Sequence, residues 1–394
     1  MVILCTALCS CNAPSAGQTL VANDLIDTNT PYVKWEGRYD TESSEEGYVK
    51  VNLYHTATGF TVDFVGTKLI VTFESEINKN SQDRYPYYAV ALDDEVLPNP
   101  NNERTFYLTG GKQEIEIVSG LAYGYHTVKC LKMSEPYDAK TSVLALETDG
   151  NFVKRDKDND QGALRFLMVC ASGGSGHGSL GYSDDGKGSM GRNTKNSSSL
   201  HAFNYLTARM FGADVQFVAN SGWGVYYGRS QSILDVLDYS GITTSNNVSG
   251  AKTTAKWDYQ QWIPDVIIFN IGGNDTTNGS FNKTTYQAKV VEMVNKLHTE
   301  YPNAYMIWTH TNSNAGNYAV ASMSDAGIMS AGYMKEVVIP KVGADGTVGA
   351  NGHNSFYTHV QTADIIANAI TEWGFTKLYE NVVFEDYLSS LYNF

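Results

Sequence analysis

The residue types needed for acyl transfer stand directly after apolar stretches in the second half of the chain. Ser172 follows the apolar stretch 165–169 and is itself followed by the glycine-rich stretch 173–178. A serine beyond a buried strand, with glycines whose amides can approach a ligand, is typical of a nucleophile or an anion-binding loop. A flexible connection is the alternative interpretation. The stretch is not a phosphate-binding P-loop, because no Gly-Lys-Ser or Gly-Lys-Thr follows.

Candidate oxyanion donors follow two further apolar stretches. The second stretch, 213–219, precedes Gly222, and the third, 265–271, precedes Asn274 and Asp275. Acyl transfer needs hydrogen-bond donors directed at the developing oxyanion, and the Ser172 and Gly222 amides and the Asn274 side chain suit that task. Tight turns and helix caps have the same residue types, so the prediction depends on the three loops meeting at one place.

A histidine near the C-terminus supplies the candidate base. His353 lies in a loop before the predicted last helix, 362–373, whereas His359 lies at or near the start of that helix. Imidazole both accepts and returns a proton near neutral pH, so His353 is the candidate general base for Ser172. An ordinary surface histidine is the alternative. No His, Asp or Glu residues have the local spacing of a metal site, so we predict no metal and no cofactor.

The second half of the chain has the pattern of an α/β domain. Continuous apolar strands at 165–169, 213–219, 265–271 and 304–309 alternate with amphipathic helical patterns at 197–212 and 284–300. This alternation predicts a three-layer α/β domain with a parallel sheet that is covered on both faces. Ligands bind beyond the carboxyl ends of the strands in such sheets, which is where the candidate residues stand.

The first half has a different pattern, with apolar and polar residues alternating in short runs. These runs are 48–53, 68–73, 88–92, 113–117 and 126–131. Alternation with period two, separated by turn residues, predicts an all-β sandwich or jelly roll. We place this domain at 18–153, the charged junction at 154–160, the α/β hydrolase domain at 161–380 and a C-terminal tail at 381–394.

Charge and composition limit the partners. The 394 residues carry a formal net charge of −14 with only 28 basic residues, which argues against a nucleic acid or an anionic membrane surface. The 26 tyrosines and 6 tryptophans offer flat faces that can stack on sugar rings. Tyrosine-rich β-sandwiches show the same excess without a ligand.

The first residues resemble an export leader. Cys5, Cys9 and Cys11 lie in or beside an apolar run, and the sequence up to Cys11 resembles a bacterial lipobox. A lipid anchor at Cys11 with a tether to Gly17 is therefore one expectation, although the leader lacks a basic segment. We expect an exported protein, either secreted or a periplasmic or cell-surface lipoprotein. Cys130 and Cys170, the other two cysteines, are expected to be buried thiols.

The order of the motifs resembles the SGNH, or GDSL-type, hydrolases. Ser172 matches the nucleophile with Gly176 and Gly178 as the glycines behind it, Gly222 matches the second block, and Asn274 matches the third. His353-x-Ser355 resembles the last block. The all-β domain in front of them resembles carbohydrate esterase family two, which joins a jelly roll to an SGNH domain and deacetylates xylan and glucomannan. Family members are understood to work with a serine-histidine dyad whose imidazole is oriented by a backbone carbonyl.

The chain departs from this pattern at several positions. Cys170-Ala171 replaces the usual Gly-Asp, Gly173-Gly174 replaces Ile-Thr, and Asn351 stands where an acidic residue often precedes the histidine. The first changes put the position of the oxyanion amide in doubt, and the last removes the expected carboxylate partner. Ser175 is the rival nucleophile if the loop register differs.

The sequence thus predicts a carbohydrate esterase that removes acetyl or similar acyl groups from a polysaccharide through a covalent acyl-enzyme. Trp223, Tyr226 and Tyr227 are the candidates for stacking on a sugar ring, with Asp275 as a further substrate-binding residue. Packing between the loop and the sandwich is the alternative for the aromatic residues. The rival function is a glycan-binding surface protein whose hydrolase domain has lost activity. The sequence does not predict an oligomeric state.

Overall fold

The computed structural model describes most of the chain. The described residues are 17–43, 49–77, 81–97, 104–156, 163–181, 188–227, 232–242, 255–277 and 279–379. Residues 1–16 of the predicted leader, including Cys11, and the predicted tail 381–394 lie outside them.

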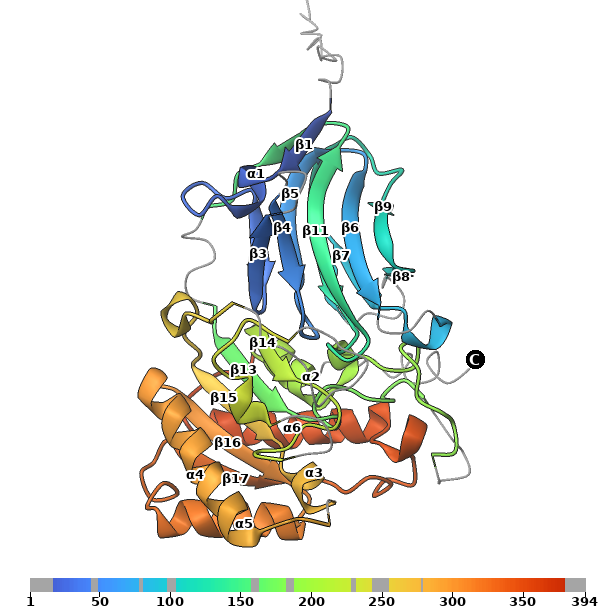
Figure 1. Ribbon diagram of the computed structural model, residues 1–394. Helices are drawn as coiled ribbons and strands as arrows, with labels where there is room; N and C mark the ends of the chain where they lie inside the picture. Colours follow the sequence, from blue (N-terminus) through green and yellow to red (C-terminus); the bar gives the residue numbers. More distant parts are fainter. Residues whose placement is uncertain are drawn as a thin grey trace, which may run out of the picture.

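The N-terminal half is a sandwich of two antiparallel sheets (Figure 1). One sheet has the order β3 (Tyr39–Ser43), β4 (Val49–Leu53), β11 (Ala139–Thr148), β6 (Leu69–Ile77) and β9 (Gly111–Val118), with β1 (Gln18–Val21) paired to β11. The other has the order β12 (Asn151–Val153), β5 (Gly59–Gly66), β10 (Gly124–Lys132), β7 (Tyr87–Leu92) and β8 (Arg104–Tyr107), with β2 (Val33–Glu36) paired to β5. Alternate residues of these strands, such as Phe60, Phe64 and Phe73, form the buried core between the sheets.

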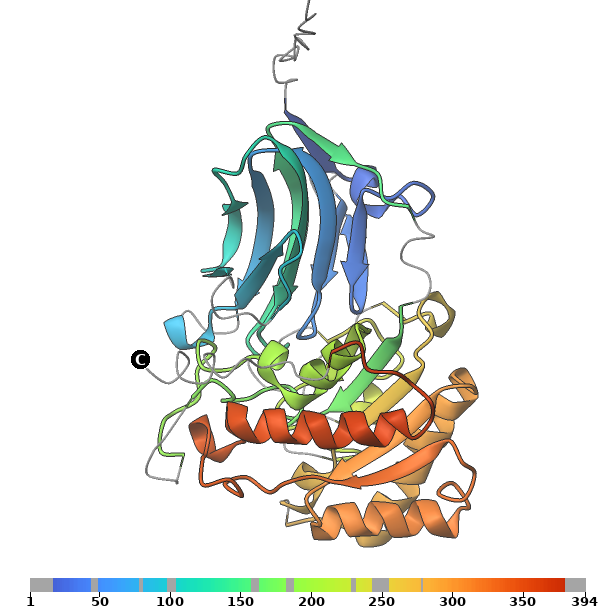
Figure 2. The same cartoon turned by 180° about the vertical axis from the view of Figure 1, so that it is seen from behind.

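The C-terminal half contains a parallel sheet. Its order is β14 (Asp214–Ala219), β13 (Arg165–Cys170), β15 (Val266–Asn270), β16 (Tyr305–His310) and β17 (Met334–Val338). Two helices, α4 (Lys283–Glu300) and α5 (Asn314–Asp325), cover one face (Figure 1). The other face is covered by α2 (Phe203–Met210) and α6 (Phe356–Thr371). Figure 2 shows this side of the molecule, with α6 in front of the sheet.

The predicted fold class is confirmed: an antiparallel β domain precedes a three-layer α/β domain. The predicted helix at 197–212 is broken, because Ala202 has an extended conformation between a 3-10 turn (Ser199–His201) and α2. The last helix begins at Phe356 rather than at 362, because the Ser355 side chain caps it by accepting a hydrogen bond from the Thr358 amide. Helix α5 and strand β17 were not among the predicted elements.

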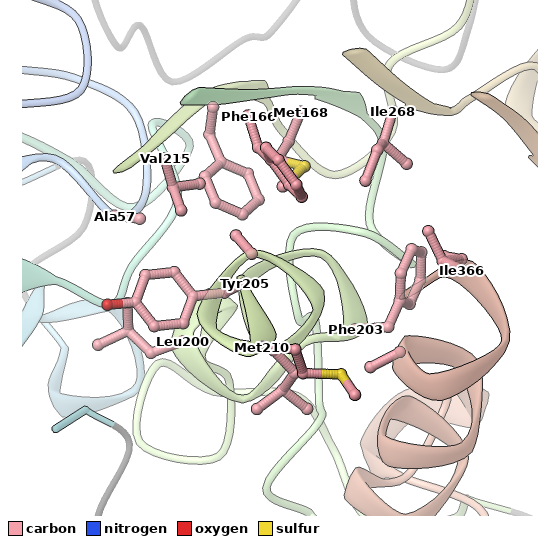
Figure 3. Close-up of a cluster of buried hydrophobic side chains, with 14 of the residues drawn as sticks. Ala57, Phe166, Met168, Leu200, Phe203, Tyr205, Met210, Val215, Ile268 and Ile366 are labelled. Carbon is pink, nitrogen blue, oxygen red and sulfur yellow. The ribbon is translucent and has the colours of Figure 1, made fainter. Parts of the chain in front are cut away.

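One cluster of buried apolar side chains joins the two domains. Side chains from the sandwich, among them Ala57 and Leu131, pack in the same cluster as Leu200, Phe203 and Phe166 of the α/β domain (Figure 3). Arg38 of the sandwich is fully buried and donates hydrogen bonds to the Gln216 side chain and to the Leu237 and Tyr239 carbonyls. The sandwich is therefore packed against the α/β domain as a structural partner.

Two further features concern the chain as a whole. Cys130 and Cys170 are buried free thiols. Within the described ranges, no helix combines the length and the apolar character needed to cross a membrane.

Candidate active site

The candidate site lies where the strand order of the parallel sheet reverses direction. The chain passes from β13 to β14 on one side and then returns to β15 on the other side of β13. The loops after β13 and β15 therefore diverge, and such a switch point is where open α/β sheets bind ligands. Ser172 follows β13, and Asn274 lies in the short helix α3 (Gly273–Thr276) after β15.

The structure brings Ser172 and His353 together. Nε2 of His353 lies 2.9 Å from Oγ of Ser172, and Nδ1 of His353 lies 2.9 Å from the carbonyl oxygen of Asn351. A carbonyl can only accept a hydrogen bond, so Nδ1 carries the proton and Nε2 accepts the one from the serine hydroxyl. Burial, together with the neighbouring His177, lowers the pKa of His353 to about 4. The imidazole is therefore neutral at pH 7 and able to take up a proton.

The glycines behind the serine allow close backbone contacts. Gly176 and Gly178 have positive φ angles of 77° and 68°. A Cβ atom would lie 2.0 Å from the Ser198 carbonyl oxygen at the first position and 2.3 Å from the Ala350 carbonyl oxygen at the second. Gly178 thus holds the serine loop against the segment that carries His353.

The predicted oxyanion donors come from the loops after three neighbouring strands of the parallel sheet, β13, β14 and β15. Among the described residues, neither the Ser172 amide nor the Gly222 amide has a hydrogen-bond acceptor. Nδ2 of Asn274 donates one hydrogen bond, 2.8 Å long, to the Trp223 carbonyl. A side-chain amide has two N–H groups, so the second remains for an oxyanion.

Asp275 does not have the predicted role of contacting substrate. Its side chain is completely buried and accepts hydrogen bonds from the amides of Val225, Tyr226 and Tyr227, at 2.8, 3.2 and 3.1 Å. Two of these amides bind one carboxylate oxygen and the third binds the other. Asp275 instead ties the loop after β14 to the loop after β15.

The three aromatic candidates differ in exposure. Trp223 is 0% exposed and packs edge-on against His55 of the sandwich. The prediction that Trp223 stacks on a sugar ring is therefore wrong. The alternative, packing between the loop and the sandwich, is what the structure shows. Tyr227 is 52% exposed, and Tyr226 is half-buried with its hydroxyl accepting a hydrogen bond from the Asn282 amide. Of the three aromatic candidates, the two tyrosines are the ones that remain accessible to solvent.

Ser175, the rival nucleophile, is placed differently from Ser172. It is almost completely buried, and its hydroxyl donates to the Ser172 carbonyl at 3.3 Å. Cys170, one of the departures from the usual motif, is also buried, and burial raises the pKa of its thiol well above the ordinary value. An uncharged thiol at this position cannot replace the serine as nucleophile.

A second group of polar residues was missed by sequence reasoning. The ring of His177 lies 4.2 Å from the ring of His353 between centroids. Nδ1 of His177 is 2.7 Å from Oγ of Ser221, whose amide and hydroxyl both donate to the carboxylate of Glu135. Glu135 comes from the sandwich domain, so no local pattern around the serine could have revealed it. His177 stood in the glycine-rich stretch but had no identified partner.

A metal ion would need several side chains that could bind it together. Across the described ranges, no three His, Cys, Asp or Glu side chains are grouped so that they could hold a metal ion.

Comparisons with known proteins agree with this architecture. No protein family model matches the chain. The cellulase/esterase CelE of Acetivibrio thermocellus is 23% identical over 359 residues, which are 86% of this chain and 39% of that protein. An acetylxylan esterase/glucomannan deacetylase of Cellvibrio japonicus is 25% identical over 298 residues, 72% of this chain and 75% of that protein.

A solved structure extends the similarity to the fold. A family two carbohydrate esterase from Clostridium thermocellum, in complex with cellohexaose, superimposes with a TM-score of 0.71 at 21% identity, covering 87% of this chain and 100% of that one. The chain thus spans the whole of that esterase structure but well under half of the first relative. In sequence it resembles the family two carbohydrate esterases, and it shares their two-domain fold.

Proposed function

We propose that the protein is a serine esterase that removes acetyl or similar acyl groups from a polysaccharide. The observation that carries the proposal is the pairing of the Ser172 hydroxyl with Nε2 of His353, while the Asn351 carbonyl holds Nδ1. This pairing supplies a nucleophile and a base in the correct tautomer. The acid that usually orients such a histidine is replaced by a backbone carbonyl.

The reaction proceeds in two acyl transfers. In the first, Oγ of Ser172 attacks the ester carbonyl carbon while its proton passes to Nε2 of His353. The oxyanion accepts hydrogen bonds from the Ser172 and Gly222 amides and from Asn274. His353 then donates the proton to the departing sugar oxygen. In the second, water attacks the acyl-serine and gives a proton to His353. His353 returns this proton to Oγ of Ser172 as the bond between Oγ and the acyl carbon breaks, which releases the carboxylic acid and free Ser172.

A carbohydrate ester is the substrate class that fits best. The named relatives include an acetylxylan esterase/glucomannan deacetylase, and a protein of the same fold was crystallised with cellohexaose. Tyr226 and Tyr227 follow the oxyanion loop and offer ring faces for a pyranose. The formal net charge of −14 favours a neutral substrate over an anionic one.

Acetate release tests the proposal. Wild-type protein, Ser172→Ala and Ser175→Ala are compared on a chromogenic acetyl ester and on acetylated xylan and glucomannan. We expect release by the wild type and by Ser175→Ala, and loss in Ser172→Ala. Full activity in Ser172→Ala would remove this serine from the mechanism. Because Ser175 lies in the same loop, its variant controls for damage to the loop.

Glycan binding without catalysis is the second candidate, favoured by the complex of the related fold with cellohexaose. It predicts that wild type and Ser172→Ala both release no acetate but bind soluble glycan equally in calorimetry. The same comparison therefore separates the two functions.

We also propose that the protein is exported, with Cys11 as the lipid attachment site. The support is the cysteine-containing apolar run at the start of the sequence. Labelling of expressing cells with radioactive palmitate, for the wild type and for Cys11→Ala, tests the anchor. Label that persists in the variant would refute attachment at Cys11.

A further inference from the structure

We propose that Glu135 of the sandwich domain is a positioning residue for His353. It acts through a chain of hydrogen bonds that passes Ser221 and His177 and ends at Asn351. The inference rests on the proposed esterase function and deepens it, because it makes the two domains parts of one active site.

The direction of the chain follows from the carboxylate. Burial alone would raise the pKa of Glu135, but hydrogen bonds from His177 and Ser221 and the charge of Arg192 lower it to about 2. An ionised carboxylate only accepts, so the Ser221 hydroxyl, 2.8 Å from Oε1, must donate to it. Oγ of Ser221 is then the nearer acceptor for Nδ1–H of His177, at 2.7 Å, and Oε1 of Glu135 lies 3.4 Å from the same nitrogen.

The tautomer of His177 then determines the orientation of Asn351. With its proton on Nδ1, His177 presents Nε2 as an acceptor, and Nδ2 of Asn351 lies 3.2 Å from it. The carbonyl of the same asparagine accepts from Nδ1–H of His353, and Nε2 of His353 accepts from Ser172. All five hydrogen bonds from Ser172 to Glu135 point the same way. The three from the Asn351 side chain to Glu135 follow one another directly and polarise each other toward the carboxylate, and they act on His353 by fixing the position of Asn351.

Asn351 is the joint of this chain. Its backbone is left-handed, with φ 55° and ψ 33°, a conformation that asparagine tolerates better than most other residues. This conformation is held at the backbone amide by the Met190 carbonyl at 2.7 Å and at the side chain by His177. The position of the Asn351 carbonyl, and therefore of the His353 ring, depends on both contacts.

The far end of the chain is also fixed. Arg192 lies 3.4 Å from Glu135 and makes two hydrogen bonds of 2.6 Å to the carboxylate of Asp138. Both Glu135 and Asp138 are almost completely buried. The bidentate pair with Asp138 fixes Arg192, whose positive charge then lies beside the buried Glu135 carboxylate in one position.

The isosteric variant Glu135→Gln tests the inference, because it reverses the direction of the hydrogen bonds between residue 135 and His177. A glutamine amide can donate to Ser221, which frees the serine hydroxyl to donate to Nδ1 of His177. The proton of His177 then moves to Nε2, where it faces the amide hydrogens of Asn351. Replacement of the partners that orient metal-bound histidines typically costs about 10- to 100-fold, and an orienting partner of a catalytic histidine should matter on the same scale. We expect a loss of that size in kcat on the chromogenic ester, with KM unchanged.

Two further variants separate positioning from stability. Asn351→Gly permits the left-handed backbone and keeps the carbonyl but removes the side-chain link, so it should lower kcat to a similar extent. Glu135→Gln added to Asn351→Gly should then cause little further loss, because the chain is already broken. Glu36→Gln is the matched control: Glu36 is another buried carboxylate of the sandwich, paired with Lys129, and its loss should leave kcat unchanged.

The outcomes are distinct from those for the proposed function. Wild-type kcat in Glu135→Gln and Asn351→Gly would overturn the inference while leaving Ser172-dependent activity intact. Losses that multiply in the double variant would also overturn it, because they would indicate independent structural damage. If Glu135→Gln does not fold, His177→Phe, which keeps a ring but removes the nitrogens that contact Ser221, Glu135 and Asn351, takes its place in the same cycle. An absence of activity in the wild type would instead count against the esterase itself.

Discussion

Nδ2 of Asn274 donates a 2.8 Å hydrogen bond to the carbonyl oxygen of Trp223, which lies next to the oxyanion candidate Gly222. This bond uses one N–H group and fixes the direction of the other. We expect Asn274→Ala to lower kcat by about 10²- to 10³-fold, since that is the usual effect of removing one oxyanion donor. Steady-state rates on the chromogenic ester measure it.

Thr276→Ala serves as the control for Asn274, because Thr276 is exposed in the same short helix and its hydroxyl only donates to the Gly273 carbonyl. This variant should keep wild-type kcat. An Asn274→Ala enzyme with wild-type kcat would show that the oxyanion is held by backbone amides alone.

Gly178→Ala should displace the segment that carries His353. The added Cβ atom would lie 2.3 Å from the Ala350 carbonyl oxygen, and the φ angle of 68° is unfavourable for alanine. Because Gly178 also accepts the Ala350 amide hydrogen bond, the collision falls on the backbone three residues before the histidine. We expect at least a tenfold fall in kcat and a lower melting temperature.

The control for Gly178 is Gly191→Ala. Gly191 has no positive φ, and a Cβ atom there meets nothing within 4 Å. This variant should behave as the wild type in both activity and melting temperature. Equal losses in the two variants would mean that the close approach at Gly178 is not what matters.

The parts of the site that the sequence predicts are those fixed by strand ends. Ser172 and Asn274 follow apolar strands, and neighbouring parallel strands bring their carboxyl ends to one edge, so the proximity of these loops follows from the pattern alone. The fold class follows equally from the change of apolar period between the two halves. His353 was identified by its residue type, and its pairing with Ser172 needed the structure.

What the sequence could not predict depends on contacts between distant segments. Glu135 reaches the site from the other domain, and nothing in its neighbourhood indicates this. Trp223 looks like its exposed neighbour Tyr227 in sequence, but the sandwich covers it. Asp275 has the residue type of a substrate ligand, and only the three loop amides around it show that it is a structural acceptor.

The pH at which kcat/KM falls on the acid side should lie well below the ordinary pKa of a histidine. Burial, together with the neighbouring His177, lowers the pKa of His353 to about 4. The base must be neutral to accept the serine proton, so kcat/KM should be flat from neutral pH downward and fall as the pH drops through about 4. Short assays in a series of buffers measure this limb. As a control, samples returned to neutral pH must recover full activity. A fall of kcat/KM already near pH 6.5 would contradict the buried position of the base.

Stability, in contrast, should start to fall at a higher pH. His55 and His359 are completely buried, and burial, with the charges of Arg38 and His353 respectively, lowers each pKa to about 3. Unfolded histidine takes up a proton near 6.5, so between that pH and about 3 the unfolded chain binds more protons than the folded one. The contribution of these two histidines to the free energy of unfolding is therefore fully present above pH 6.5 and is lost as the pH falls toward about 3.

Urea unfolding at pH 7.5 and pH 5.0 checks this expectation. Each of the two histidines should remove about 2 kcal/mol from the free energy of unfolding over that interval, given about 1.4 kcal/mol per pKa unit. In His359→Asn, whose side-chain oxygen can still accept the Phe203 amide hydrogen bond, the loss should shrink by about that amount. His126→Gln is the control, because hydrogen bonds to the Ala122 carbonyl and Asp93 outweigh burial and raise the pKa of His126. His126→Gln should not reduce the fall in the free energy of unfolding between pH 7.5 and pH 5.0. If it reduced that fall as much as His359→Asn does, buried neutral histidines would not be the cause of the pH dependence.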